Sequence, residues 1–289
     1  MEQAGSEAAI RARAAEAVAA CAERAGVVVR MLTGGPEYEA AAELFTAVWQ
    51  APSVPEHILR VLGLSGNYVA GAFDEGGRLV GASVAFACIF EEPELHSHIT
   101  GVAMSHRHSG VGVVLKLHQR SWALEHGIGL INWTFDPLIK RNANFNLARL
   151  GATAVDYLVN VYGIMHDALN GRDESDRLLV RWRLADREVE AAAAGFPRRV
   201  KSPPGTVERL KPGPDGHPVV RSAREGDAPA FTCRVPDDME SLRSSDPELA
   251  SAWRVALREV LGRPLAAGAQ LLGLNEEGDY VVAGPPGAP

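Results

Sequence analysis

The spacing of apolar and polar residues divides most of the chain into short segments with the period of strands and longer ones with the period of helices. Apolar runs and alternations predict strands over 27–32, 68–73, 79–90, 95–104, 127–135, 153–162 and 178–184. Apolar residues three and four positions apart predict helices over 37–49, 56–64, 110–126, 141–150 and 185–194. The resulting order, β-α-α-β-β-β-α-β-α-β-β, predicts one α/β (α+β) domain at residues 26–195.

The regions on either side of this domain show weaker patterns. A helix is expected within residues 1–25, where it either caps the domain or pairs with another subunit in a homodimer. Residues 196–218, with several Pro, Gly and basic residues, are expected to form a linker. Residues 219–289 are expected to form an extension packed on the main domain, with a strand or two over 219–235, a helix over 246–261 and a closing hairpin. Asp246 or Ser245 would cap that helix, with Pro247 in its first turn.

Composition excludes several classes of function. The net charge of -7 argues against nucleic-acid binding, which needs a basic face. No apolar run approaches the roughly 20 residues of a membrane helix, and the N-terminus lacks a signal-peptide core, so we expect a cytoplasmic protein without membrane contact. The three cysteines are scattered and form no metal-binding spacing, which predicts reduced thiols and no metal.

The most informative stretch joins the fourth predicted strand to the following helix. Its sequence, Arg107-His108-Ser109-Gly110-Val111-Gly112, fits the pattern R/Q-x-x-G-x-G/A. Free backbone N–H groups and the helix dipole make such a turn a candidate phosphate site. It lacks the G-x-G-x-x-G of dinucleotide-binding turns and the Gly-Lys-Ser/Thr of P-loops. The alternative is an ordinary strand–helix turn that needs glycine.

The fourth strand carries an unexpected row of polar residues. Strict alternation would place His96, His98 and Thr100 on one face, and Leu95, Ser97 and Ile99 on the other. A polar row does not fit a purely apolar core, although buried histidines are commonly just hydrogen-bonded structural residues. Asp136, which ends the fifth strand, is either a functional carboxylate or part of a turn with Pro137.

With this element order and this loop, the chain resembles the GNAT superfamily of acetyl-CoA-dependent N-acyltransferases. It is similar in particular to a branch of predicted acetyltransferases with a C-terminal extension. The segments that carry this similarity are Trp133–Leu138, Arg141–Ala143, Phe145-Asn146, Leu150-Gly151, Tyr162-Gly163, Val235–Asp238 and Trp253-Arg254.

The resemblance implies a GNAT acyl-CoA N-acyltransferase fold, in which a mixed central sheet has parallel strands four and five splayed apart and acetyl-CoA or another acyl-CoA enters between them. The backbone of the fourth strand's end would pair with pantetheine and polarise the thioester, the loop would hold the pyrophosphate, and an asparagine would lie near the cofactor. The corresponding residues are Gly101, Val102, Ala103 and Met104; Arg107, His108, Ser109, Gly110, Val111 and Gly112; and Asn142.

The implied activity is direct transfer of an acetyl or other short acyl group to the amine of a small molecule. Such transfer needs a base for the ammonium, polarisation of the carbonyl and a proton for the thiolate. His96, His98 and Asp136 are the catalytic candidates, with Glu92 and Glu94 behind them.

The chain departs from the family pattern at one position. Many GNAT enzymes protonate the thiolate with a tyrosine where this chain has Leu147, and Tyr157 and Tyr162 are the nearby phenols. A thiolate with a pKa near about 8.5 also leaves unaided. The alternatives are therefore an acyl-CoA-binding module without turnover, or acyl transfer involving a carrier protein.

Overall fold

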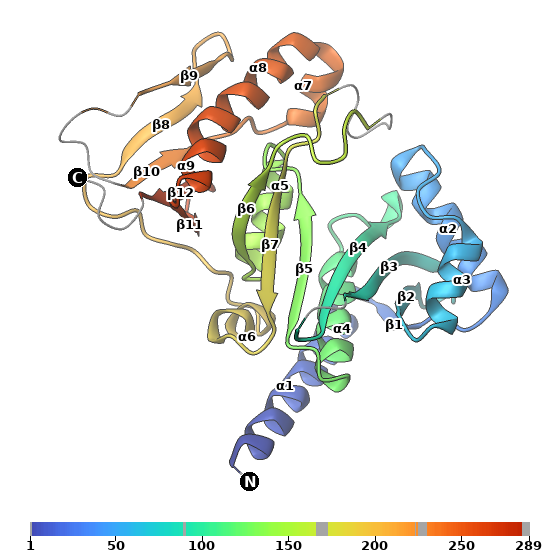
Figure 1. Ribbon diagram of the computed structural model, residues 1–289. Coiled ribbons are helices and arrows are strands. Elements are labelled where there is room, and N and C mark those ends of the chain that lie inside the picture. Colours follow the sequence, from blue (N-terminus) through green and yellow to red (C-terminus); the bar gives the residue numbers. More distant parts are fainter. Residues whose placement is uncertain (1, 89–90, 166–172, 223, 225–229, 285–289) are drawn as a thin grey trace. The chain divides into compact units, whose positions relative to one another are not determined.

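The computed structural model describes residues 2–88, 91–165, 173–222, 224 and 230–284 (Figure 1). The chain forms two compact units. The first comprises Met1–Trp133 and Arg183–Ala194, and the second comprises Thr134–Trp182 and Gly195–Pro289. The chain therefore enters the second unit inside its fifth strand.

A mixed sheet of seven strands has the order β1-β2-β3-β4-β5-β7-β6. Its parallel pair, β4 with β5, lies between antiparallel pairs, which confirms the predicted mixed sheet with strands four and five parallel. The strands are β1 (Val27–Met31), β2 (Tyr68–Asp74), β3 (Leu79–Cys88), β4 (Glu94–Val102), β5 (Leu130–Phe135), β6 (Thr153–Leu158) and β7 (Arg177–Arg183).

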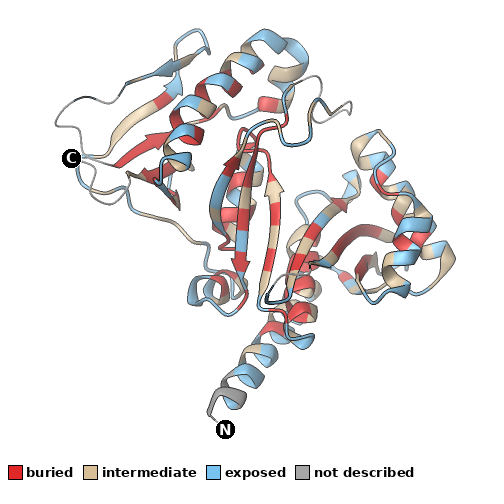
Figure 2. Ribbon diagram, in the orientation of Figure 1, coloured by how far each residue is buried: buried red, intermediate tan, exposed pale blue. Residues whose placement is uncertain are grey.

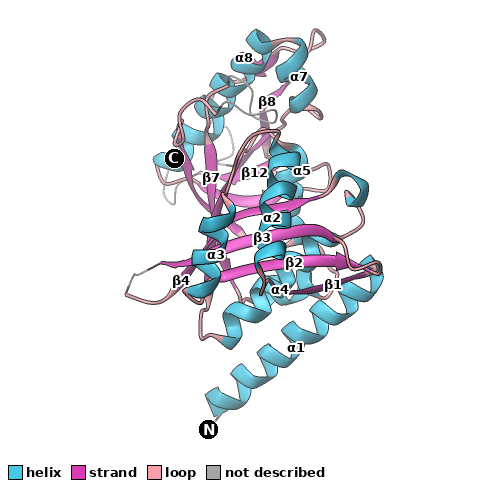
Figure 3. Cartoon of the chain, turned by 90° about the vertical axis from the view of Figure 1, so that its right-hand side faces the viewer, coloured by secondary structure: helices cyan, strands magenta, loops and turns pink. Residues whose placement is uncertain are grey.

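Helices cover both faces of the sheet in the first unit (Figure 3). Its helices are α1 (Glu2–Ala25), α2 (Gly35–Trp49), α3 (Glu56–Leu64), α4 (Val111–Glu125) and α6 (Arg187–Ala193), with a 3₁₀ turn at Met104–His106. Phe45 and Leu59 of α2 and α3 form one apolar cluster with Val84. On the other face, Leu115 of α4 lies in a cluster with Cys21 of α1, so α1 packs on its own unit. Pairing of α1 with a second subunit stays a prediction.

The second unit also contains a five-stranded sheet of its own. Strands β8 (Val207–Pro212), β9 (Pro218–Val220), β10 (Ala230–Cys233), β11 (Gln270–Leu274) and β12 (Tyr280–Ala283) have the order β11-β12-β10-β8-β9. The helices of this unit are α5 (Lys140–Ala143), which continues as a π-helical turn over Asn144–Arg149, α7 (Met239–Ser245), α8 (Pro247–Leu257) and α9 (Arg263–Ala266). Red segments in Figure 2 show buried residues on β10 and β12 and on the inner side of α8.

The structure corrects several sequence-based expectations. The segment expected to be a linker contains β8, which pairs in parallel with β10, because Val207 and Leu210 reach the second sheet despite the surrounding prolines and glycines. Helix α7 was not predicted at all. The cap of α8 is confirmed, since the Asp246 side chain accepts from the Leu249 amide. The parts of the predictions that fall on residues 89–90, 223, 225–229 and 285–289 lie outside the described residues.

Other expectations concern the cysteines, metal binding and membrane-spanning helices. Cys21, Cys88 and Cys233 are free. The described residues contain no group of three His, Cys, Asp or Glu side chains able to hold a metal. No described helix combines the length and apolar character that crossing a bilayer requires.

Candidate active site

Strands β4 and β5 pair over only three positions. Their register joins Glu94 to Leu130, Leu95 to Ile131 and His96 to Asn132, whereas β4 continues to Val102. Within the described residues, β5 has no register partner for β4 beyond His96. Residues 97–102 of β4 therefore present an unpaired backbone edge, which is a template for an added strand. We call the point where the two strands part the fork root.

A β-bulge lies in β4 immediately beyond the fork root. Ser97 is opposite Ala85 and Ile99 is opposite Val84, so His98 is the extra residue. The bulge reverses the predicted alternation. Ile99 packs with the α2–α3 cluster, while the Thr100 hydroxyl lies 2.8 Å from Oγ of Ser83. The prediction that Thr100 shares a face with His96 and His98 is therefore wrong.

A hydrogen-bonded chain of side chains orients His96. Nδ1 of His96 lies 2.7 Å from Oδ1 of Asn132, and Nδ2 of Asn132 donates to Oε2 of Glu94 at 2.9 Å. Because an ionised carboxylate only accepts, the Asn132 amide must turn its oxygen toward His96. Nδ1 of His96 therefore carries the hydrogen, and Nε2 of the neutral ring keeps its lone pair, as a general base requires.

The second histidine of the strand lies beside the first. The Phe86 ring has its centre 5.2 Å from that of His96 and 5.8 Å from that of His98. His98 is exposed, yet partial desolvation, followed by its electrostatic interaction with His96, lowers its pKa from the ordinary value. His98 therefore remains neutral over more of the acidic range than a free histidine. Glu92 is exposed, whereas Glu94 takes part in the chain that orients His96.

The loop between β4 and α4 leaves several amides uncommitted, although the amides of Arg107 and Ser109 donate to the carbonyls of Met104 and His106. No described residue accepts a hydrogen bond from the amides of His108, Gly110, Val111 or Gly112. Gly110 caps α4 at a φ of 93°, and its carbonyl accepts from the amides of Val113 and Val114. The amides of the first helical turn consequently face away from the helix, in the arrangement that binds anions. Arg107, His108 and Ser109 are exposed, and Oγ of Ser109 donates to the His106 carbonyl at 2.6 Å.

The end of β4 contributes fewer free amides than predicted. The Ala103 amide donates to the Val80 carbonyl at 2.9 Å and is therefore not available to a ligand. Since alternate amides of a strand point to opposite edges, the Val102 amide faces the unpaired edge. Gly101 is needed for packing, because a Cβ there would come within 3.0 Å of Trp49 and 3.1 Å of Phe45. Met104 is 75% exposed.

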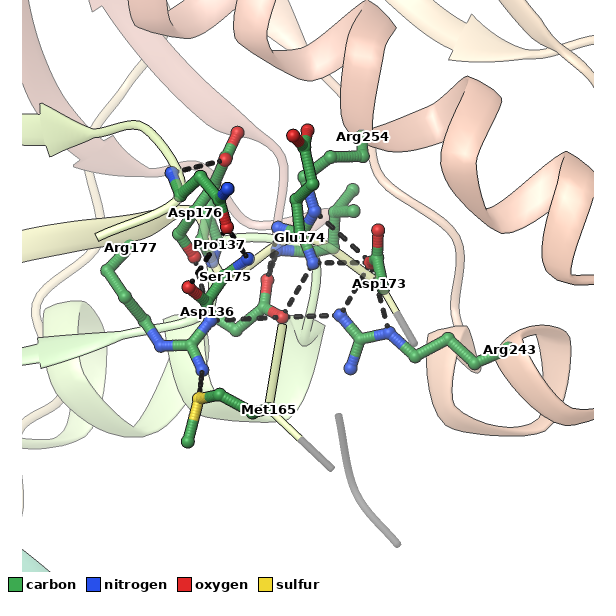
Figure 4. A network of polar contacts seen from close by, with 12 residues as sticks. Asp136, Pro137, Met165, Asp173, Glu174, Ser175, Asp176, Arg177, Arg243 and Arg254 are labelled. Carbon is green, nitrogen blue, oxygen red and sulfur yellow. Dashed lines mark hydrogen bonds and ion pairs between the residues drawn. The ribbon is translucent and has the colours of Figure 1, made fainter. Parts of the chain in front are cut away.

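Asp136 lies in the second unit, within a buried ion-pair network (Figure 4). Arg254 donates to both of its carboxylate oxygens at 2.9 and 2.8 Å, Arg243 donates to Oδ2, and Arg177 lies 3.7 Å away. The arginine charges outweigh the opposing effect of desolvation and hold the pKa of Asp136 far below its ordinary value. A carboxylate held this way is a poor proton acceptor. These contacts fit a structural role instead of the predicted catalytic one.

The turn that the sequence offers as the alternative for Asp136 is present. The Leu138 amide donates to Oδ1 of Asp136 at 2.9 Å, and the Ile139 amide donates to its carbonyl. Sequence reasoning missed the arginines and Asp173, which bridges Arg243 and Arg254. The sequence feature that could have indicated this contact is the presence of Asp136-Pro137 after the fifth strand together with Trp253-Arg254 in the extension.

The remaining predicted residues also belong to the second unit. Asn142 lies in α5, half-buried, with its amide donating to the Ile139 carbonyl. Leu147 is buried in the π-helical turn. The Tyr157 hydroxyl donates to Oδ2 of Asp176 at 2.8 Å, and desolvation together with that carboxylate raises its pKa well above the ordinary value. Tyr162 is exposed, with its hydroxyl 3.0 Å from that of Thr134.

Comparison with known proteins gives similarity at the level of structure. No protein-family model matches the sequence, and no curated protein does either. Three solved structures superpose on about half of it: the NatC complex bound to Gag peptide and CoA (13% identity, 54% of this chain, 98% of that chain, TM-score 0.45), the ribosomal-protein-S18-alanine N-acetyltransferase from Escherichia coli (11%, 55%, 94%, 0.45) and a putative GNAT-family acetyltransferase from Desulfovibrio desulfuricans (16%, 55%, 99%, 0.44).

These likenesses have TM-scores below 0.5 and identities below 25%, and they say nothing about the substrate. The fold is evident from the chain's own topology. The strand order, the brief parallel contact of β4 with β5 and the second, C-terminal sheet form a GNAT fold with a C-terminal extension.

Proposed function

We propose that this protein is an acyl-CoA-dependent N-acyltransferase, which moves an acetyl or other short acyl group to an amine. The observation that carries this proposal is the set of uncommitted amides at His108, Gly110, Val111 and Gly112, in the same unit as the unpaired edge of β4. A diphosphate would accept from the loop amides, and the thioester arm would pair along β4. Acetyl-CoA is the expected cosubstrate, with no metal.

The residues of the first unit supply the steps that aminolysis of a thioester needs. Nε2 of His96 takes the proton from the ammonium of the acceptor, directly or through one water, because only the neutral amine attacks. An amide of the unpaired edge over residues 97–102 donates to the thioester oxygen as negative charge develops there. The C–N bond forms, the C–S bond breaks, and the thiolate takes a proton from solvent or from His96.

We propose a small-molecule amine as the acceptor. The net charge of -7 favours approach of a cationic amine over an anionic one. A cytoplasmic location and the absence of nucleic-acid or membrane partners stay predictions. Acyl transfer involving a carrier protein is the competing acceptor class. It would appear as acylation of an added carrier in place of free amines.

His96→Ala is expected to lower turnover about 100-fold, the usual contribution of a general base, while leaving the Kd of acetyl-CoA within about twofold of wild type. Thiol release with an amine panel measures turnover, and isothermal titration measures binding. Asn132→Leu, which removes the group that orients the ring, should lower turnover less. His217→Ala, an exposed histidine of the second unit, is the matched control.

Two outcomes would change this proposal. Equal losses of turnover and affinity in His96→Ala would make His96 a structural residue. A wild-type chain that binds acetyl-CoA but releases no thiol with any amine or carrier would be an acyl-CoA-binding module without turnover.

A further inference from the structure

A buried lysine of α4 lies at the fork root. Nζ of Lys116 donates to Oγ of Ser97 at 2.9 Å and to Oε1 of Gln119 at 2.8 Å, and it lies 3.8 Å from the centre of the Trp133 ring. Ser97 and Trp133 are the first residues of β4 and β5 beyond their last pair. One ammonium group therefore contacts both strands where they separate.

The polar contacts continue from Lys116 beneath the open part of β4. Nε2 of Gln119 donates to Oγ of Ser83 at 3.4 Å, and that hydroxyl shares a hydrogen bond of 2.8 Å with Thr100. Gln119 and Ser83 are fully buried. Polar groups in such a core destabilise it unless they are hydrogen-bonded, and here the bonds join α4 to β4 on both sides of the bulge.

We propose that Lys116 is a positioning residue for acyl-CoA. Through Ser97 and Trp133 it fixes the two strands at the fork root and keeps the unpaired edge of β4 ordered before a ligand arrives. An edge that is already ordered loses less conformational freedom when a thioester arm pairs with it, so binding is tighter. This inference rests on the proposed function and adds to it a residue that prepares the cosubstrate site.

Burial of the Lys116 ammonium helps to distinguish a positioning role from a purely structural one. Desolvation lowers the pKa of Lys116 well below its ordinary value, which shows that burial of the ammonium is unfavourable. Replacing Lys116 by an apolar side chain removes this cost but also removes a hydrogen-bond donor from Ser97 and Gln119, so the two effects on stability oppose each other. A residue retained for stability alone would gain little from being a lysine here. A residue retained for positioning would weaken binding when replaced, without weakening the fold.

Lys116→Met in the full chain tests this inference. The melting temperature should change little, because relief from burying the ammonium offsets the two lost hydrogen bonds. The Kd and KM for acetyl-CoA should both rise about tenfold, because the edge of β4 is less ordered before binding. The KM for the amine should not change. In the ligand-free protein, the backbone amides over 97–102 should exchange with deuterium faster than in the wild type.

Tyr68→Phe provides a matched control, because the Tyr68 hydroxyl contacts the same helix, α4. The Tyr68 hydroxyl contacts the Leu115 carbonyl at 3.3 Å and Nδ1 of His118 at 3.0 Å, and Tyr68 lies on β2, away from the fork root. This variant should lower the melting temperature and leave acetyl-CoA binding unchanged.

The outcomes separate this inference from the function on which it rests. A Lys116→Met protein with wild-type Kd and wild-type exchange over 97–102 overturns the role of Lys116 and leaves the transferase intact. A lower melting temperature with unchanged Kd makes Lys116 a structural residue and also overturns it. A wild-type chain that fails to bind acetyl-CoA refutes the proposed function, and the role of Lys116 in binding falls with it.

Discussion

Gly110→Asp is expected to weaken acetyl-CoA binding more than about 100-fold in a chain that still folds. An aspartate at the start of α4 places a negative charge among the loop amides, where the diphosphate would lie, and like charges in such a contact cost several kcal/mol. Gly110 also has a φ of 93°, which an L-residue adopts only with strain. Isothermal titration with acetyl-CoA measures the effect. Gly112→Asp, in the first turn of the same helix, should also weaken binding.

Gly77→Asp is the control for the strain. Gly77 has a φ of 74° in the turn between β2 and β3, and a Cβ there meets no atom within 4 Å. This variant places the same charge on a glycine of similar conformation, so it should lose comparable stability without losing affinity. Wild-type affinity in a folded Gly110→Asp chain would remove the proposed diphosphate site.

Arg254→Met is expected to destabilise the second unit by about 3–5 kcal/mol, the range seen when one partner of a buried ion pair is removed. The guanidinium is 1% exposed and bonds both Asp136 and Asp173, so its loss leaves buried carboxylates with less compensation. Urea unfolding, followed by hydrogen exchange in peptides of residues 134–165 and 230–284, measures the change.

Arg263→Met is the matched control, since its side chain is 75% exposed and pairs only at the surface with Glu259. Its effect on stability should be within about 0.5 kcal/mol. If Arg254→Met were as stable as Arg263→Met, the network around Asp136 would not hold the unit together.

Acid should weaken the second unit through Asp136. Because its folded-state pKa is depressed, its stabilising contribution is complete above the unfolded pKa of about 3.9 and is lost as pH falls toward the folded value. Stability measured between pH 7 and pH 3 should therefore decline at the acidic end. Asp136→Asn should be less stable at pH 7 and show a smaller decline. An equal decline in both proteins would assign the acid sensitivity to other carboxylates.

Local patterns in the sequence were sufficient to predict most of the fold. The apolar period of α4, the alternation of β5 and the Asp246 cap depend on neighbouring residues, and their bounds agree with the structure to within a few positions. The bulge at His98 was not predictable, because it depends on how β4 registers against β3. Strand β8 was missed because its few apolar residues are surrounded by turn-forming ones, and its stability comes from pairing with β10.

Candidate site residues could be named from the sequence where the pattern is local, and they stay predictions; contacts between distant residues could not be foreseen. The glycine-containing loop was found because its residues are consecutive. The hydrogen-bonded chain from Glu94 through Asn132 to His96 joins residues up to 38 positions apart on two strands. It can be inferred only once the register of those strands is known. Arg254 lies 118 positions from Asp136, a separation at which no periodicity signals contact.

The entry of the chain into its second unit at Thr134 has a consequence for shortened forms of the protein. A chain ending near residue 195 would contain Asp136 and Pro137 but would lack Arg243, Arg254 and the Tyr280 hydroxyl, which donates to the Pro137 carbonyl at 2.7 Å. Residues 134–182 would then lack residues 195–289, which complete the second unit. Such a fragment would be prone to proteolysis and aggregation, so residues 134–182 need the rest of the second unit to be stable.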